Sequence, residues 1–234
     1  MPHTFKIPLL RASVWSQEGG REASTSFLDR ASGPPDVAFL DPLIRRRLSP
    51  LGRAMLHCAQ RAAGDQGPLP SVFSSRHGEA GRSLPVLEDL AQGLPPSPTQ
   101  FSMNVHNASA GIWSIARRDP SPSLSLAAGL ESFAWGLVEA QAIHAAAPET
   151  PVLLVHGDAP LPPLWASFDA NPLPLHALAL LIGLPAIHHL ILTWSPEARP
   201  AVADGPWEGP CALDFEAPGG PWATADGTWA WRVE

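Results

Sequence analysis

The chain has few of the residues on which several common functions depend. Of its 234 residues two are cysteines and none is tyrosine. The cysteines, Cys58 and Cys211, are too few for a disulfide framework or a cysteine-rich metal site. Lysine and arginine number 15 against 22 acidic residues, for a net charge of −7. This balance argues against general nucleic-acid binding, which needs clustered basic side chains for the phosphates.

Targeting segments and membrane-spanning runs are also missing. The first residues lack the charged region and apolar core of a signal peptide. The longest apolar run, Leu173 to Leu184, is interrupted by Pro174 and His176 and is too short to cross a bilayer. We therefore expect a cytoplasmic protein without a membrane span. Cofactor motifs are equally absent, since neither a phosphate-binding loop nor a dinucleotide fingerprint occurs, and no cofactor is expected.

Hydrophobic residues make up 45% of the chain, enough to bury a core, and we expect one domain over residues 1–234. Within it, residues 19–35 are rich in loop-forming residues, and residues 195–234 form a tail rich in Trp, Gly and Pro. Runs typical of strands alternate with helical patterns, which predicts a layered α/β sheet. The expected strands are Phe5–Trp15, Ser71–Arg76, Pro122–Ala127, Pro151–Val155, Leu175–Ile182, Ile187–Trp194 and, as a closing edge strand, Gly227–Glu234.

Helices are expected between these strands. The clearest begins at Ser49-Pro50, because serine is a good N-cap and proline suits the first helical position. Arg45, Arg46 and Arg47 stand at the start of this helical pattern, as a solvated face or as a docking patch for an acidic partner. One face of the helix carries the apolar residues Leu51, Met55, Cys58 and Ala62. The other expected helices are Ser83–Leu90, Phe101–Ile115 and Leu130–Ala145.

Polar groups at strand ends are candidate binding residues. Arg76-His77-Gly78-Glu79 follows one strand, where α/β folds place binding groups, although a turn with a local Arg–Glu pair explains it as well. His156-Gly157-Asp158 follows another, and a strand-ending turn is the simpler interpretation. His188 and His189 cannot share a metal, because adjacent residues of a strand point to opposite faces. The sequence therefore predicts no metal site.

Three short strings occur in an order that is typical of one enzyme family. Arg46 to Met55 begins with basic residues and continues into a helix face, and Asn107-Ala-Ser-Ala-Gly111 precedes Ser114-Ile115. Pro122-Ser-Leu-Ser-Leu-Ala-Ala-Gly129 has the layout of a strand that leads into a nucleophile elbow. In order and spacing these strings resemble the N-terminal half of the β-ketoacyl synthase family. The resemblance implies an α/β fold, with a single thiolase-like half unit of order βαβαβαββ and a mixed sheet covered by helices.

Two further strings resemble a short, chain-length-factor-like subgroup of that family. They are Ser75-Arg76-His77-Gly78-Glu79 and the segment from Ser97 to Asn107. In active members the elbow strand continues as Thr-Ala-Cys and enters a buried helix. Matching Ala134 and Gly136 to that helix places the nucleophile position at Ala128, within one residue. The resemblance thus implies a scaffold without its cysteine.

Other catalytic groups of the family are missing as well. Active members carry histidine or asparagine strings in a second half, and this sequence ends before such a half could form. Thioester condensation needs a thiolate to hold the acyl group and imidazoles to drive decarboxylation. We therefore expect no catalytic residue, and no catalytic activity of the chain alone.

The resemblance implies a chain-length-factor-like subunit that forms a heterodimer with an active β-ketoacyl synthase. The pathway would be type II fatty-acid or polyketide biosynthesis, aryl-polyene-type pathways in particular, with substrate arriving on acyl carrier protein. His106 and Asn107 contact the partner or line an acyl tunnel, or else form a buried pair that satisfies backbone groups. The residues expected near the interface or acyl pocket are Phe101, Met103, His106, Asn107 and Trp113.

Two other functions stay open at this stage. One is an active acyltransferase or hydrolase that uses Ser125 or Ser132 with His106, although the Gly-x-Ser-x-Gly elbow of many hydrolases is absent. The other is a self-associating structural protein. The sequence does not tell which synthase would be the partner, which acyl chain length it would set, or what the tail contacts.

Overall fold

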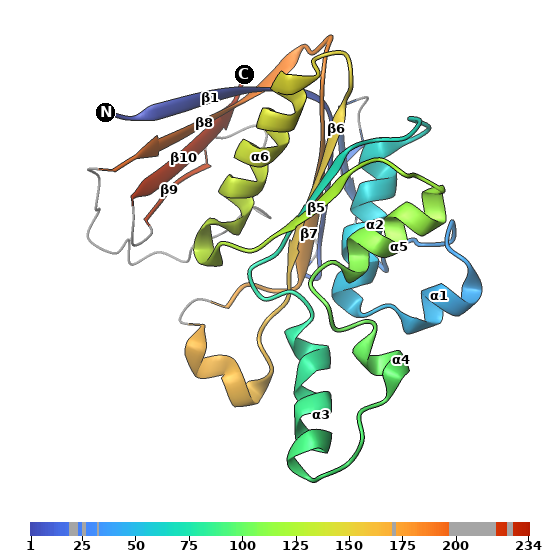
Figure 1. The fold of residues 1–234 in the computed structure, drawn as a ribbon. Coiled ribbons are helices and arrows are strands. Elements are labelled where there is room, and N and C mark those ends of the chain that lie inside the picture. The colour runs from blue at the N-terminus through green and yellow to red at the C-terminus, as the bar shows by residue number, and fades with distance from the viewer. Residues whose placement is uncertain (19–22, 25–26, 32, 170–171, 197–218, 224–226) are drawn as a thin grey trace.

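The computed structural model describes residues 1–18, 23–24, 27–31, 33–169, 172–196, 219–223 and 227–234. A mixed sheet forms the centre of the molecule (Figure 1). Its strands are β1 (His3–Ser16), β2 (Ala23–Ser24), β3 (Leu28–Ala31), β4 (Ser71–Ser74), β5 (Ser123–Leu126), β6 (Val152–Asp158), β7 (His176–Ile182), β8 (His188–Ser195), β9 (Gly219–Ala223) and β10 (Thr228–Val233). They follow the order β5-β4-β6-β7-β1-β8-β10-β9, with β3 beside β1 and β2 beside β3.

Helices cover both faces of this sheet. They are α1 (Pro42–Arg47), α2 (Pro50–Ala63), α3 (Ala80–Ala91), α4 (Pro98–Phe101), α5 (Ala108–Arg117) and α6 (Ser132–Ala146), with short 3-10 turns η1 (Gly129–Glu131) and η2 (Pro163–Phe168). Helices α2 and α5 lie on one face and α6 lies on the other (Figure 1). Each face has its own apolar core, one built around α2 and the other around α6. The expected α/β half unit with a mixed, helix-covered sheet is therefore confirmed.

Strand direction divides the sheet into two parts. Strands β5, β4 and β6 are parallel, whereas β6, β7, β1, β8, β10 and β9 run antiparallel to their neighbours in that order. Strands β6 and β7 are continuously apolar through their centres because helices cover them from both sides. Leu154 and Leu180, for example, face α6, whereas Leu153 and Leu181 face α2.

The helix predicted from Ser49-Pro50 is confirmed. The Ser49 Oγ accepts a hydrogen bond from Gly52 N at 2.8 Å, and Pro50 takes the first helical position. The predicted apolar face is buried, including Cys58. The three arginines, however, end α1 rather than begin α2. Leu48 and Ser49 are both extended, Ser49 because a residue before proline avoids helical backbone angles, and this separates the two helices.

Three other expectations about elements are wrong. Residues 19–35 include β2 and β3, although their composition predicts a loop. Helix α5 begins at Ala108, because Ser102 to Asn107 form turns, in which the Ser102 hydroxyl donates to Thr99 O. Strand β10 is not an edge strand, since β9 pairs with it on the side away from β8. No helix within the described part of the chain is long and apolar enough to cross a membrane.

Candidate functional site

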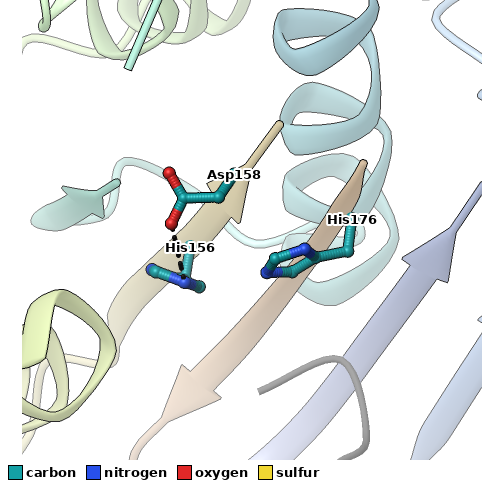
Figure 2. A group of neighbouring side chains, drawn as sticks. All are labelled: His156, Asp158 and His176. Carbon is teal, nitrogen blue, oxygen red and sulfur yellow. Dashed lines mark ion pairs between the residues drawn. The ribbon is translucent and has the colours of Figure 1, made fainter. Parts of the chain in front are cut away.

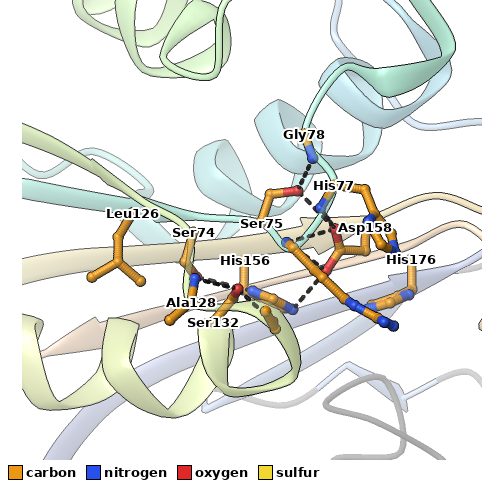
Figure 3. A network of polar contacts seen from close by, with 12 residues as sticks. Ser74, Ser75, His77, Gly78, Leu126, Ala128, Ser132, His156, Asp158 and His176 are labelled. Carbon is orange, nitrogen blue, oxygen red and sulfur yellow. Dashed lines mark hydrogen bonds and ion pairs between the residues drawn. The ribbon is translucent and has the colours of Figure 1, made fainter. Parts of the chain in front are cut away.

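Hydrogen bonds to Ser132 hold the turn between β5 and α6, which we call the elbow. Ala128 precedes η1, and Gly129 has a φ of +56°, a conformation that favours glycine. The Ala128 N–H donates to Ser132 Oγ at 2.9 Å, and the Ser132 hydroxyl donates to Gly129 O at 2.7 Å (Figure 3). The expected nucleophile position thus carries a methyl group on a well-formed turn.

A polar cluster lies at the strand ends next to this elbow, on the α6 face of the sheet (Figure 3). We call Ser74, His156, Asp158 and His176 the strand-end cluster. Ser74 and His156 are register partners on parallel β4 and β6, and Ser74 Oγ lies 2.9 Å from His156 Nδ1. Asp158 and His176 are partners on antiparallel β6 and β7. Sheet register therefore gathers these four side chains.

Burial keeps both imidazoles of the cluster neutral at neutral pH. It lowers the pKa of His156 to about 4, with the neighbouring His176 adding to the effect and Asp158 opposing it. The pKa of His176 is also lowered, again chiefly by burial. Each ring thus offers one nitrogen lone pair, to a proton donor or to a metal ion.

Asp158 holds the loop that follows β4. Its Oδ1 accepts hydrogen bonds from Ser75 Oγ at 2.7 Å, Arg76 N at 2.8 Å and His77 N at 3.0 Å. Gly78 completes the turn at φ +54°, and a Cβ there would lie 2.9 Å from His106 Nδ1. The His156–Asp158 segment is therefore part of β6 and anchors a loop; the expected strand-ending turn is wrong.

The local Arg–Glu pair expected in this loop does not form. Arg76 instead pairs with Asp169, with Nη1 2.8 Å from Oδ1, and His77 Nε2 lies 3.4 Å from the other oxygen of Asp169. Glu79 accepts from Ser49 Oγ at 2.7 Å and pairs with Arg82 at 3.4 Å. The loop is thus tied to α2 and to the segment after η2 by contacts between residues far apart in sequence.

The residues expected near a partner or acyl pocket lie in two different environments. Phe101 is 60% exposed, and Met103 is partly buried against the α2 core. His106 and Asn107 are exposed, so the alternative of a buried pair is wrong. The His106 Nε2–H donates to Leu126 O at 3.0 Å, at the end of β5. Trp113, in contrast, is 2% exposed and lies within the core.

Among the described residues, the geometry does not assemble the expected alternative nucleophiles Ser125 and Ser132 with His106. The Ser132 hydroxyl is buried and bonded within the elbow, and no hydrogen bond between described residues joins His106 to Ser125 or Ser132. Burial raises the pKa of the Cys58 thiol to about 12, which keeps it protonated and unreactive. Cys211 lies outside the described residues.

Sequence reasoning missed the strand-end cluster. His156 and Asp158 are two residues apart, so on a strand they share one face. A signal is therefore present for these two residues, whereas the position of His176 opposite Asp158 depends on the register of β6 with β7 across a long connection. The predicted strand ends at Val155, so it includes neither His156 nor Asp158.

Strand β5, the turn at Gly129 and the buried helix α6 together form a scaffold of the condensing-enzyme type. The comparisons with known proteins agree with this class. The chain belongs to the β-ketoacyl synthase family, since the model of the family's N-terminal domain matches residues 15–208. A chain in the complex of the ketosynthase ApeO with its chain length factor ApeC, from Xenorhabdus doucetiae, is 29% identical and has a TM-score of 0.67. That match covers 87% of this chain and 84% of the other.

More distant structures share the fold alone. A ketosynthase from module 1 of the bacillaene synthase of Bacillus amyloliquefaciens FZB42 is 17% identical, with a TM-score of 0.53. A β-ketoacyl synthase from Burkholderia phymatum STM815 is 12% identical, with a TM-score of 0.52. The matches cover 76% and 65% of this chain but only 42% and 46% of those longer chains. No curated protein matches the chain.

Proposed function

We propose that the chain is a non-catalytic, chain-length-factor-like subunit that pairs with an active β-ketoacyl synthase. The observation that carries this proposal is the elbow, where Ala128 stands at the position expected for the nucleophile and the turn around it is intact. The one cysteine among the described residues, Cys58, is buried on another helix and held as a thiol. An intact scaffold without a nucleophile fits a subunit that supports another enzyme.

The similarity to the ApeO–ApeC complex supports the same function. Nearly equal coverage of both chains means that the matched chain is about as long as this one, whereas the two distant synthase chains are much longer. The matched chain belongs to a complex of a ketosynthase with its chain length factor, which supports a role for this chain as one subunit of such a complex. By extension, the partner would take its acyl groups from acyl carrier protein in the cytoplasm, in a polyketide pathway of the aryl-polyene type.

The edge of the sheet at β5 is the surface that we propose for the partner. Strand β5 pairs with β4 on one side and with no described strand on the other. Its Leu124 is 40% exposed, and Phe101 and Val105, close to His106 in sequence, are 60% and 42% exposed. An edge strand with exposed apolar side chains is a site at which another chain can add. The His106 contact to Leu126 O brings the Phe101–Asn107 segment to the end of β5.

Co-expression with a candidate synthase tests this pairing. We expect the two chains to co-elute from gel filtration as a stable complex. Leu124→Lys places a charge on the proposed interface and should weaken the complex at least tenfold. Ile187→Lys is the matched control, because Ile187 is 89% exposed before β8, away from β5, and should leave pairing unchanged. Equal losses in both variants, or a self-assembled chain that ignores the synthase, would refute the proposed interface.

A further inference from the structure

Three potential metal ligands converge at the ends of β6 and β7. His156 and Asp158 are two residues apart on β6 and share one face, and the antiparallel register sets His176 directly opposite Asp158. Figure 2 shows the ring of His176 extending toward His156, with the carboxylate of Asp158 beside it. One ligand atom from each residue lies within 4.8 Å of the others. Both histidines are nearly inaccessible, at 2% and 1% exposure.

The hydrogen bonds of His176 leave its Nε2 as the free nitrogen, and His156 turns its Nε2 toward Asp158. His176 Nδ1 lies 2.9 Å from Pro174 O, and since a carbonyl only accepts, this nitrogen carries the proton. His176 Nε2 is then a buried lone pair, and it has no hydrogen-bond partner among the described residues. His156 Nδ1 faces Ser74 Oγ, and its Nε2 faces Asp158. Such outer hydrogen bonds to the second ring nitrogen are what metal-binding histidines usually make.

The carboxylate of Asp158 is also held in a position from which it can bind a metal ion. Both oxygens of Asp158 accept hydrogen bonds from the loop after β4: Oδ1 from Ser75 Oγ and the His77 N–H, and Oδ2 from the Arg76 N–H at 3.0 Å. A carboxylate oxygen has two lone pairs, so Oδ2 keeps one for a metal ion. Oδ2 lies 3.6 Å from His156 Nε2, too far for a hydrogen bond. Two ligands of one tetrahedral zinc ion, each about 2.1 Å from it, are roughly 3.4 Å apart. The pair is therefore spaced as two ligands of one ion would be.

We propose that His156 Nε2, His176 Nε2 and Asp158 Oδ2 bind a divalent transition-metal ion, with zinc as the best-suited ion. Two imidazoles and one carboxylate suit zinc rather than magnesium or calcium, which prefer all-oxygen sites. The widest separation in the group, 4.8 Å, needs a contraction of well under 2 Å, which small side-chain rotations supply. The low pKa of both histidines is consistent with ligation, because a neutral ring is the form that binds metal.

The ion would have a structural role beside the elbow. It would fasten the end of β6 to the start of β7 and, through Asp158, hold the loop after β4. Three buried ligands with second-layer hydrogen bonds can stabilise a fold, and a tetrahedral ion here would take its fourth ligand from water. This site does not depend on pairing with a synthase, so it can be present or absent independently of the proposed function.

Zinc binding by the purified full chain tests the proposal. After treatment with a chelator and dialysis, the chain is titrated with zinc chloride alone, and bound zinc is measured by mass spectrometry. We expect one more equivalent of zinc in the wild type than in His176→Leu or Asp158→Asn. His57→Gln is the matched control, because His57 is also buried with an unpartnered Nε2 but lies outside the group. It should bind as much zinc as the wild type.

Two results would overturn the site. One is a wild type that binds no zinc, and the other is a folded His176→Leu variant that binds as much as the wild type. If neither variant folds, X-ray absorption of the zinc-loaded wild type decides the question. Two imidazoles with oxygen neighbours support the site, whereas sulfur ligation, which would point to Cys211, or fewer than two imidazoles refutes it.

Discussion

Single side chains join the loop after β4 to helix α2. The Ser49 hydroxyl caps α2 by accepting from Gly52 N, and at the same time it donates to Glu79 Oε1 at 2.7 Å. Burial raises the pKa of Glu79, although the hydrogen bond from Ser49 and the charge of Arg82 oppose the shift. The folded protein therefore favours the protonated form of this carboxyl group more than the unfolded chain does.

This raised pKa predicts the pH dependence of a Glu79→Gln variant. Well below pH 4.5, the ordinary pKa, Glu79 is protonated in both the folded and the unfolded chain. As pH rises, the unfolded chain ionises first, so the wild type loses stability until pH passes the raised folded pKa. The substituted glutamine keeps the acceptor for Ser49 and does not ionise. Urea unfolding at pH 4 and pH 7 should therefore show the variant gaining stability relative to wild type at the higher pH; a relative loss would contradict the shift.

Local chemistry explains which residues the sequence predicted well. Ser49 and Pro50 define a helix start within two residues, and Cys58 follows from the spacing of its own helix. The strand-end cluster depends on register between β6 and β7, which no local pattern specifies. Trp113, expected near the interface or the acyl pocket, is buried by the packing of α5 on α2, a contact that no local pattern specifies.

Helix α6 packs closely on the sheet at one glycine. A Cβ on Gly136 would lie 2.9 Å from Ser74 Oγ and 3.1 Å from Leu154 Cδ1. Ser74 Oγ is itself bonded to His156, so it cannot move without disturbing the strand-end cluster. The separation between α6 and strands β4 and β6 is thus set by the absence of a side chain.

A pair of glycine variants tests this packing. Gly136→Val should destabilise the fold by about 1–3 kcal/mol, because the added carbons overpack the contact. Gly111→Ala is the control: it lies within α5 with no atom within 4 Å of its Cβ position. Because alanine favours helix, this change should stabilise by up to about 1 kcal/mol. Unfolding by denaturant measures both, and a neutral Gly136→Val would mean that the contact is looser than described.

Elements with strong periodic or apolar patterns were predictable, and the others were not. The central strands β6 and β7 and the helix α6 have long apolar runs that predict them directly. The turns from Ser102 to Asn107 interrupt a helical pattern through local hydrogen bonds such as that of Ser102. Strand β9 exists as a strand by pairing with β10, a contact between distant segments that composition does not indicate.

The sheet as a whole ends at β5, beside the elbow and the exposed side chains proposed for the partner. Leu130, within the elbow and 39% exposed, adds to this surface, whereas Trp135 on α6 packs its ring on Trp229 of β10, toward the other end of the sheet. The helix is apolar around its circumference, which is typical of one that is covered on more than one side. At this scale the molecule is suited to association along the β5 edge of the sheet.

Acyl transfer to the assembled complex tests the central proposal most directly. The co-purified synthase and this chain are incubated with acyl-loaded carrier protein, and the intact mass of each chain is measured. We expect the acyl mass on the synthase alone, with this chain unchanged, because Ala128 has no nucleophile and Cys58 stays protonated. An acyl adduct on this chain, at Ser125, Ser132 or a cysteine, would contradict its role as a non-catalytic subunit.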